Sequence, residues 1–107
     1  MAYALVKYSV KDHDKWKPIF DNYGATRKNA GCKGGQVFHA FGKKNDLIIL
    51  FEWDTKEHAA NFFDSEDTKK TQQSAGVIGK PEIHYMEKVE NFSAWWGNSY
   101  GIFSCRS

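Results

Sequence analysis

Two histidines stand within apolar segments of this sequence, where an imidazole could act as a general base. His39 follows Phe38, and His84 lies between Ile83 and Tyr85. Histidine titrates near neutral pH, so either ring could carry a proton or donate a hydrogen bond if it faced an enclosed cavity. Each could equally be a structural histidine, buried or at a sheet edge, with its ring nitrogens satisfied. We therefore consider His39 and His84 as alternative candidates for the catalytic base.

Three further side chains could complete a site for a small aromatic compound. Tyr8 and Trp53 carry flat rings that could stack on such a compound, which makes them candidate substrate-binding residues. Glu52 alternates with Leu50 on an otherwise apolar strand, so its carboxylate is a third catalytic candidate. The alternatives are core packing for the two rings and a position near solvent at the strand end for Glu52.

Other kinds of chemistry have no signature in the chain. The four histidines show no HxH, HxxxH or HExxH spacing, so no metal site is predicted. Cys32 and Cys105 lie far apart without a second ligand pair, and both are expected to remain reduced thiols. Neither a phosphate-binding loop nor a GxGxxG fingerprint is present. We expect no cofactor.

Composition is typical of one small globular domain. The chain has 107 residues, of which 41% are hydrophobic and 26% are charged, with a net charge of +2. That charge is too small, and the basic residues too dispersed, for an electrostatic nucleic-acid binder. No window approaches the ~18 apolar residues of a membrane span, and the N-terminus lacks a cleavable leader. No nucleic-acid or membrane partner is expected, and the predicted location is cytoplasmic.

Hydrophobic periodicity predicts the order β-α-β-β-α-β. Strands are expected over residues 3–10, 36–41, 47–53 and 82–89, with a turn over residues 42–46 between the second and third. In the first of these strands the more apolar face is formed by Ala4, Val6, Tyr8 and Val10, and the opposite face by Leu5, Lys7 and Ser9. The first helix carries its apolar side chains at i, i+3, i+4 and i+7, beginning at Trp16.

The second helix is predicted to begin after a cap at Asp54 or Thr55 and to be interrupted at Ser65. The order is that of the ferredoxin-like fold, an α+β arrangement with one four-stranded antiparallel sheet. We assign this domain to residues 1–90 and treat residues 91–107 as an aromatic-rich C-terminal extension.

The third predicted strand, residues 47–53, indicates how this fold would assemble. It is apolar on both faces, whereas helices in a ferredoxin-like fold cover one face of the sheet. Two subunits that meet sheet to sheet would cover the other face and enclose a cavity. The patterning thus predicts a homodimer.

Several short motifs resemble the dimeric α+β barrel superfamily, and within it the antibiotic biosynthesis monooxygenase-like and cyclase-like small bacterial proteins. They are DxDxWKxxF at residues 12–20, AGC at 30–32, EW at 52–53 and AGVxGxP at 75–81. The resemblance covers residues 2–90. Thr68 and Gln72 depart from it, since larger apolar residues are expected there, and the aromatic tail has no counterpart in the family.

The resemblance implies a cofactor-independent monooxygenase or cyclase acting on a small hydrophobic or aromatic, polyketide-like compound. In this interpretation His39 or His84 is the base, and Tyr8 and Trp53 orient the substrate. The alternative is a noncatalytic ligand-binding or dimeric interaction protein. The aromatic tail could then clasp the neighbouring subunit, close the cavity mouth or pack on its own helices.

Overall fold

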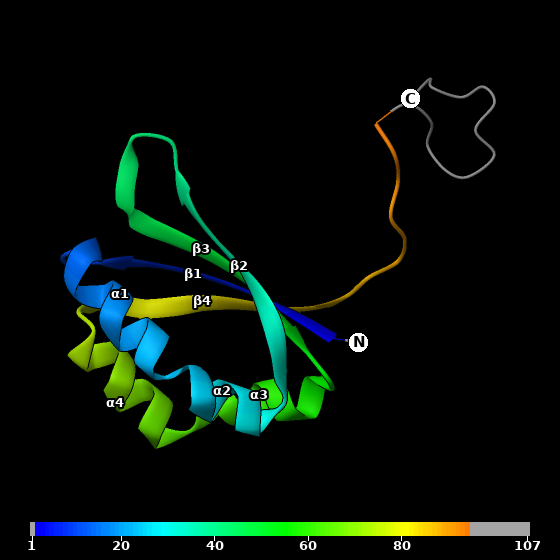
Figure 1. Cartoon of the computed structure of the whole chain (residues 1–107), viewed down its shortest axis with the longest axis horizontal. Helices are drawn as coiled ribbons and strands as arrows, with labels where there is room; N and C mark the ends of the chain where they lie inside the picture. Colours follow the sequence, from blue (N-terminus) through cyan, green and yellow to red (C-terminus); the bar gives the residue numbers. More distant parts are fainter. Residues whose placement is uncertain (1, 95–107) are drawn as a thin grey trace.

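The computed structural model describes residues 2–94. Its elements are β1 (Ala2–Val10), α1 (His13–Asn22), α2 (Gly24–Ala30), β2 (Cys32–Ala40), β3 (Lys43–Trp53), α3 (Lys56–Asp64), α4 (Glu66–Ser74) and β4 (Val77–Glu87). The order confirms the predicted ferredoxin-like fold, with each of the two helical regions divided into a pair of helices (Figure 1).

The four strands form one antiparallel sheet in the order β2-β3-β1-β4. All four helices lie on the same side of this sheet, so one face is covered and the other is open (Figure 1). Ala4, Val6 and Val10 of β1 are buried beneath the helices, which confirms the face predicted from their alternation. We call the two sides of the sheet the helix face and the open face.

Side-chain caps explain where α3 and α4 begin. The Thr55 hydroxyl accepts a hydrogen bond from the His58 backbone N–H at 3.1 Å, so Thr55 is the cap of α3 and the alternative cap, Asp54, is not. The Asp54 carboxylate instead contacts the His58 ring, 2.9 Å from Nδ1. The Ser65 hydroxyl accepts from the Thr68 N–H at 3.2 Å and begins α4, which confirms the predicted interruption.

The β2–β3 turn is shorter than predicted. Ala40 pairs with Lys43, so Phe41 and Gly42 alone make the turn and residues 43–46 belong to β3. The backbone of Gly42 has φ 78°, a left-handed conformation that glycine adopts at little cost. A two-residue turn can therefore form here, and the polar residues 43–46, predicted as part of a turn, lengthen the hairpin instead.

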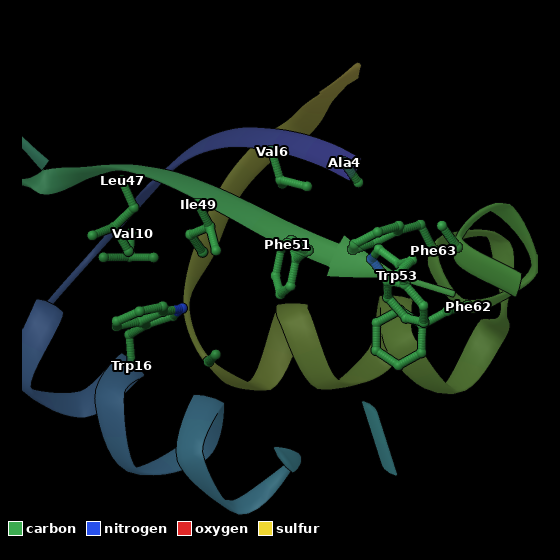
Figure 2. Close-up of a cluster of buried hydrophobic side chains, with 12 residues drawn as sticks. Ala4, Val6, Val10, Trp16, Leu47, Ile49, Phe51, Trp53, Phe62 and Phe63 are labelled. Carbon is green, nitrogen blue, oxygen red and sulfur yellow. The ribbon is translucent and has the colours of Figure 1, made fainter. Parts of the chain in front are cut away.

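Aromatic side chains form most of the core between the sheet and the helices (Figure 2). Trp16 packs beneath Val10 and Leu47 at one end, and Trp53 packs with Phe62 and Phe63 at the other (Figure 2). Trp16 is 1% exposed and Trp53 is completely buried. These two clusters hold α1 and α3 against the strands that carry the candidate site.

The described chain ends in an extended segment after β4, where the Phe92 side chain is 78% exposed. The expected docking of the rest of the aromatic tail lies outside the described residues. Within residues 2–94, no helix combines the length and the apolar character that a membrane crossing requires.

Candidate functional site

A small cavity of about 40 Å³ lies between the helices and the helix face of the sheet. Its walls come from all four helices, from β1 and from the start of β4. Most of the lining is aromatic or aliphatic, and a few polar groups point into it, the pattern of a small-molecule site. We call it the helix-side cavity.

A hydrogen-bonded pair, Tyr8 and Trp16, forms the wall against the sheet. Tyr8 follows the buried face of β1, and Trp16 lies on the inner side of α1. The Trp16 indole Nε1–H donates to the Tyr8 hydroxyl oxygen at 3.0 Å. The Trp16 ring also stacks on Phe20, with 4.7 Å between ring centroids. The pair therefore combines a flat aromatic surface with one hydroxyl group.

The Tyr8 hydroxyl is held in its neutral form. Burial raises its pKa above 10.0, while the Trp16 hydrogen bond and the charge of Arg27 offset part of that effect. The oxygen accepts from Trp16, and no second hydrogen bond of this hydroxyl occurs among residues 2–94. Its own proton is thus free to be donated to a ligand, which makes Tyr8 a hydrogen-bond donor and not a base.

A second polar group, Tyr23, closes the cavity at the junction of α1 and α2. Its hydroxyl donates to the Asp67 carboxylate at 2.6 Å and lies 3.3 Å from the Thr68 hydroxyl. Burial and then the Asp67 hydrogen bond raise the Tyr23 pKa, so this hydroxyl too remains protonated. The contact ties the α1–α2 junction to α4 across the cavity.

The third polar group is the Arg27 guanidinium of α2. It lies over the Phe20 ring, 4.0 Å from the centroid, and its Nη1 donates to the Phe20 carbonyl oxygen at 2.7 Å. Burial lowers the Arg27 pKa. A cation, two phenolic hydroxyls and an indole thus surround an aromatic cavity whose described lining includes no carboxylate and no imidazole.

The structure places only one of the five predicted site residues in this cavity. Tyr8 lines it, whereas Trp53 lies in the core beside Phe62 and Phe63. The Trp53 Nε1 has no hydrogen-bond partner among residues 2–94. Trp53 therefore packs the core, the alternative weighed for it from the sequence.

The two candidate histidines lie on opposite faces of the sheet. His39 pairs with Leu47, so its side chain is on the helix face of the sheet. It is nevertheless exposed, because this end of the hairpin extends beyond the helices. His84 pairs with Leu5 on the open face, where its Nε2 lies 2.6 Å from a Glu82 carboxylate oxygen. The two imidazoles do not converge, and neither lines the helix-side cavity.

Glu52 is also on the open face. It pairs with Tyr3 of β1 and Gly34 of β2 and is half-buried. The central part of this face is apolar, with Leu5 paired to Leu50 and Phe38 paired to Ile48. The Phe38 side chain is 50% exposed, so the open face presents an apolar surface to its surroundings.

Comparison with known proteins establishes the fold. No protein-family profile and no curated protein matches the sequence. A Bordetella bronchiseptica protein assigned to the antibiotic biosynthesis monooxygenases superposes with a TM-score of 0.70 at 15% identity, over 83% of this chain and 97% of its own. SnoaB from Streptomyces nogalater, described as a cofactor-independent oxygenase, gives 0.69 at 10% identity, over 84% and 94%.

A third similar structure is a dimeric ferredoxin-like protein from an uncultured marine organism. Its TM-score is 0.57 at 11% identity, over 87% of this chain and 99% of that one. The chain has the ferredoxin-like α+β fold of these proteins. The helix-side cavity is formed within this chain, and its helices leave the open face of the sheet uncovered.

Trp16, Tyr23 and Arg27 are the site residues that sequence reasoning missed. The sequence identifies the first two only as part of the inner face of a helix, and it predicts no role for Arg27. Positions 16, 20, 23 and 27 nevertheless follow one helical stripe, and Arg27 is one of only two arginines beside 13 lysines. An arginine that continues a stripe of aromatic residues along a helix is therefore the feature of the sequence that could have indicated this site.

Proposed function

We propose that this protein is a homodimeric, small-molecule-binding α+β barrel that acts as a cofactor-independent monooxygenase on a small electron-rich aromatic compound. The observation that carries the proposal is the neutral Tyr8 hydroxyl, fixed by Trp16 in an aromatic cavity with its proton unused. SnoaB, which has the same fold, is described as a cofactor-independent oxygenase, and this supports the choice of reaction.

The groups in the cavity suit stabilisation of an anion. The Tyr8 O–H would donate to the oxyanion of an enolate or phenolate, and the Arg27 charge would favour the same negative charge. The cavity lining offers no carboxylate or imidazole base, so the substrate must be acidic enough to ionise with little help. When the substrate ionises, its C–H proton passes to water, and the carbanion carbon of the resulting anion adds O2 to give a peroxide anion. The peroxide anion takes a proton back from water to become a hydroperoxide, which loses water and leaves a carbonyl group. One oxygen atom enters the substrate and the other leaves as water.

Oxygen uptake with 1,8-dihydroxy-9-anthrone as probe tests this function. The wild-type protein is expected to consume one O2 for each anthraquinone formed and to release no hydrogen peroxide. Tyr8→Phe should lower the rate on the order of 100-fold, as expected when one oxyanion donor is removed. Tyr3→Phe is the matched control, since Tyr3 lies on the open face of the same strand, and its rate should be unchanged. Equal losses in both variants, or no uptake above the protein-free rate, would refute the proposal.

A noncatalytic ligand binder is the second candidate. The lack of a carboxylate or imidazole among the lining residues favours it, because a binder needs the aromatic walls and the hydroxyl donor but no base. The same anthrone distinguishes the two functions. Saturable binding, with Tyr8-dependent affinity and no oxygen uptake, would identify a binding protein.

The homodimer is proposed from the apolar surface of the open face. Leu5 lies at its centre, between Leu50 and His84 on the neighbouring strands. A second copy would cover it. Leu5→Lys should shift the protein from dimer to monomer in native mass spectrometry, whereas Gln73→Lys on the exposed side of α4 should leave the dimer intact. A monomeric wild-type protein would overturn this assembly.

The domain boundary is proposed to lie after Glu90, since the last strand ends at Glu87. A chain of residues 1–90 should then unfold in one cooperative transition. Loss of that transition would show that residues 91–107 belong to the folded domain.

A further inference from the structure

Arg27 is a half-buried cation without an acidic partner. No Asp or Glu among residues 2–94 lies within salt-bridge distance of its guanidinium. Asp21 is the carboxylate whose charge acts on Arg27, yet its oxygens are held by Lys17 Nζ at 2.6 Å. The Phe20 carbonyl and ring are the contacts of the guanidinium itself. A partly desolvated charge without a counter-ion gains strongly from an anionic ligand.

Arg27 also stands between two cavities. With Phe20 it lines both the helix-side cavity and a second cavity of about 190 Å³ that runs toward β2. Gly34 and Gly35 line the second cavity, so part of that wall is backbone with no side chain standing on it. We call this second space the β2-side cavity. Arg27 and Phe20 are the lining residues that the two cavities share.

The volumes of the two cavities favour a ligand that spans both of them. A cavity that holds one benzene ring measures about 150 Å³. The helix-side cavity, at about 40 Å³, is too small for a ring, whereas the β2-side cavity is large enough for one. A flat ligand with fused rings that reached Tyr8 from the β2-side cavity would extend through the position that the Arg27 guanidinium occupies.

We propose that Arg27 is the specificity-determining residue of this site and that the ligand is a planar aromatic carboxylate. Its carboxylate would draw the guanidinium away from Phe20 into a two-bond ion pair. Its rings would then occupy the joined cavities between Phe20 and the backbone of Gly34 and Gly35. The inference rests on the proposed function for the placement of the ligand in the helix-side cavity, but not on any oxidation.

A carboxylate is the anion that best fits the observed groups. The planar guanidinium presents paired N–H donors that match the two oxygens of a carboxylate, and a phenolate offers only one oxygen. The ion pair would replace the single bond from Nη1 to the Phe20 carbonyl. The ring stack of Trp16 and Phe20 would continue onto the ligand rings.

Binding of 2-naphthoic acid and of neutral 2-naphthamide to the full chain tests the proposal, with calorimetry as the readout. The wild-type protein should bind the acid on the order of tenfold or more tightly than the amide, the effect of a charge-assisted pair. Arg27→Gln should abolish that preference while amide binding persists, and Arg27→Lys should retain part of it. Lys28→Gln, which removes the adjacent exposed cation, is the matched control and should keep the wild-type preference.

Three results would overturn the inference. These are equal affinities of the wild-type protein for acid and amide, an acid preference that survives Arg27→Gln, and tighter binding of 2-naphthyl phosphate than of the acid. Circular dichroism of each variant shows whether it is folded. Because no oxygen is consumed in this assay, Arg27-dependent acid binding supports the inference even if the anthrone is never oxidised. Oxidation of the anthrone without an acid preference would support the monooxygenase and refute the role of Arg27.

Discussion

Replacement of Tyr8 by Phe isolates one hydrogen bond in the centre of the site. The change removes the oxygen that accepts the Trp16 Nε1–H at 3.0 Å and leaves the two rings in place. Trp16 is 1% exposed, so bulk water does not reach its indole freely. A buried donor left without an acceptor costs about 1–3 kcal/mol. The cavity beside it, at about 40 Å³, exceeds the roughly 15 Å³ that one water needs, so a water can partly replace the hydroxyl.

We therefore expect Tyr8→Phe to lower the free energy of unfolding by about 1–2 kcal/mol, toward the low end of that range. For a domain of this size, 1 kcal/mol corresponds to a fall in Tm of about 4–8 °C. Urea unfolding followed by circular dichroism gives the free energy, with every variant at the same protein concentration because a dimer adds a concentration-dependent contribution. Tyr3→Phe on the open face serves as the control.

A double-mutant cycle with Trp16→Phe shows whether the loss comes from this bond. In the Trp16→Phe background the indole donor is absent, so the cost of Tyr8→Phe should fall by about 1 kcal/mol. The reasoning would be refuted if Tyr8→Phe cost the same in both backgrounds, since Tyr8 would then act through some other contact.

Two further predictions concern the sheet and alkaline pH. A Cβ added at Gly35 would overlap the Leu50 carbonyl oxygen, so Gly35→Ala should lower the free energy of unfolding by about 1–3 kcal/mol. Gly24→Ala in α2 is the control, because a Cβ there meets only ordinary contacts and should not lower it. Urea unfolding of both variants measures the difference, and equal effects would contradict the close approach of Gly35 to Leu50. Burial raises the pKa of Tyr8 in the folded protein above its unfolded value near 10. The neutral Tyr8 hydroxyl therefore contributes fully to stability below about pH 10, and this contribution is lost as the pH rises through the folded pKa. The free energy of unfolding should thus fall above pH 10, and the fall should be smaller in Tyr8→Phe; an identical pH dependence would count against a buried hydroxyl.

The fold was largely predictable from sequence because its signals are local. Alternation in β1 identified Ala4, Val6 and Val10 as the buried row, and Ser65 was recognisable as a break between helices. The hairpin turn was mispredicted because polar residues suit both a loop and an exposed strand end. Only the backbone of Gly42 shows that two residues suffice.

The site was predictable only in part, because its residues are united by tertiary packing. Alternation showed that Tyr8 and Lys7 point to opposite sides, and the register confirms it. Alternation shows which side chains of one strand share a side, but not which sides of two different strands lie on the same face of the sheet. His39 and His84 are therefore equivalent candidates in the sequence, and only the strand pairing places them on opposite faces. Arg27 was missed because a charged residue at the end of a helical stripe is usually solvated.

The indole N–H resonance of Trp16 tests most directly whether the helix-side cavity is the ligand site. The chain has four tryptophans, and Trp53 is the internal control because its indole lies in the same core but does not line the cavity. Substitution of each tryptophan by Phe assigns the signals in a ¹⁵N spectrum. Titration with 2-naphthoic acid should shift the Trp16 signal, which reports on the hydrogen bond to Tyr8, and leave the Trp53 signal in place. Saturable binding that leaves the Trp16 signal unmoved would place the ligand elsewhere and contradict the proposed site.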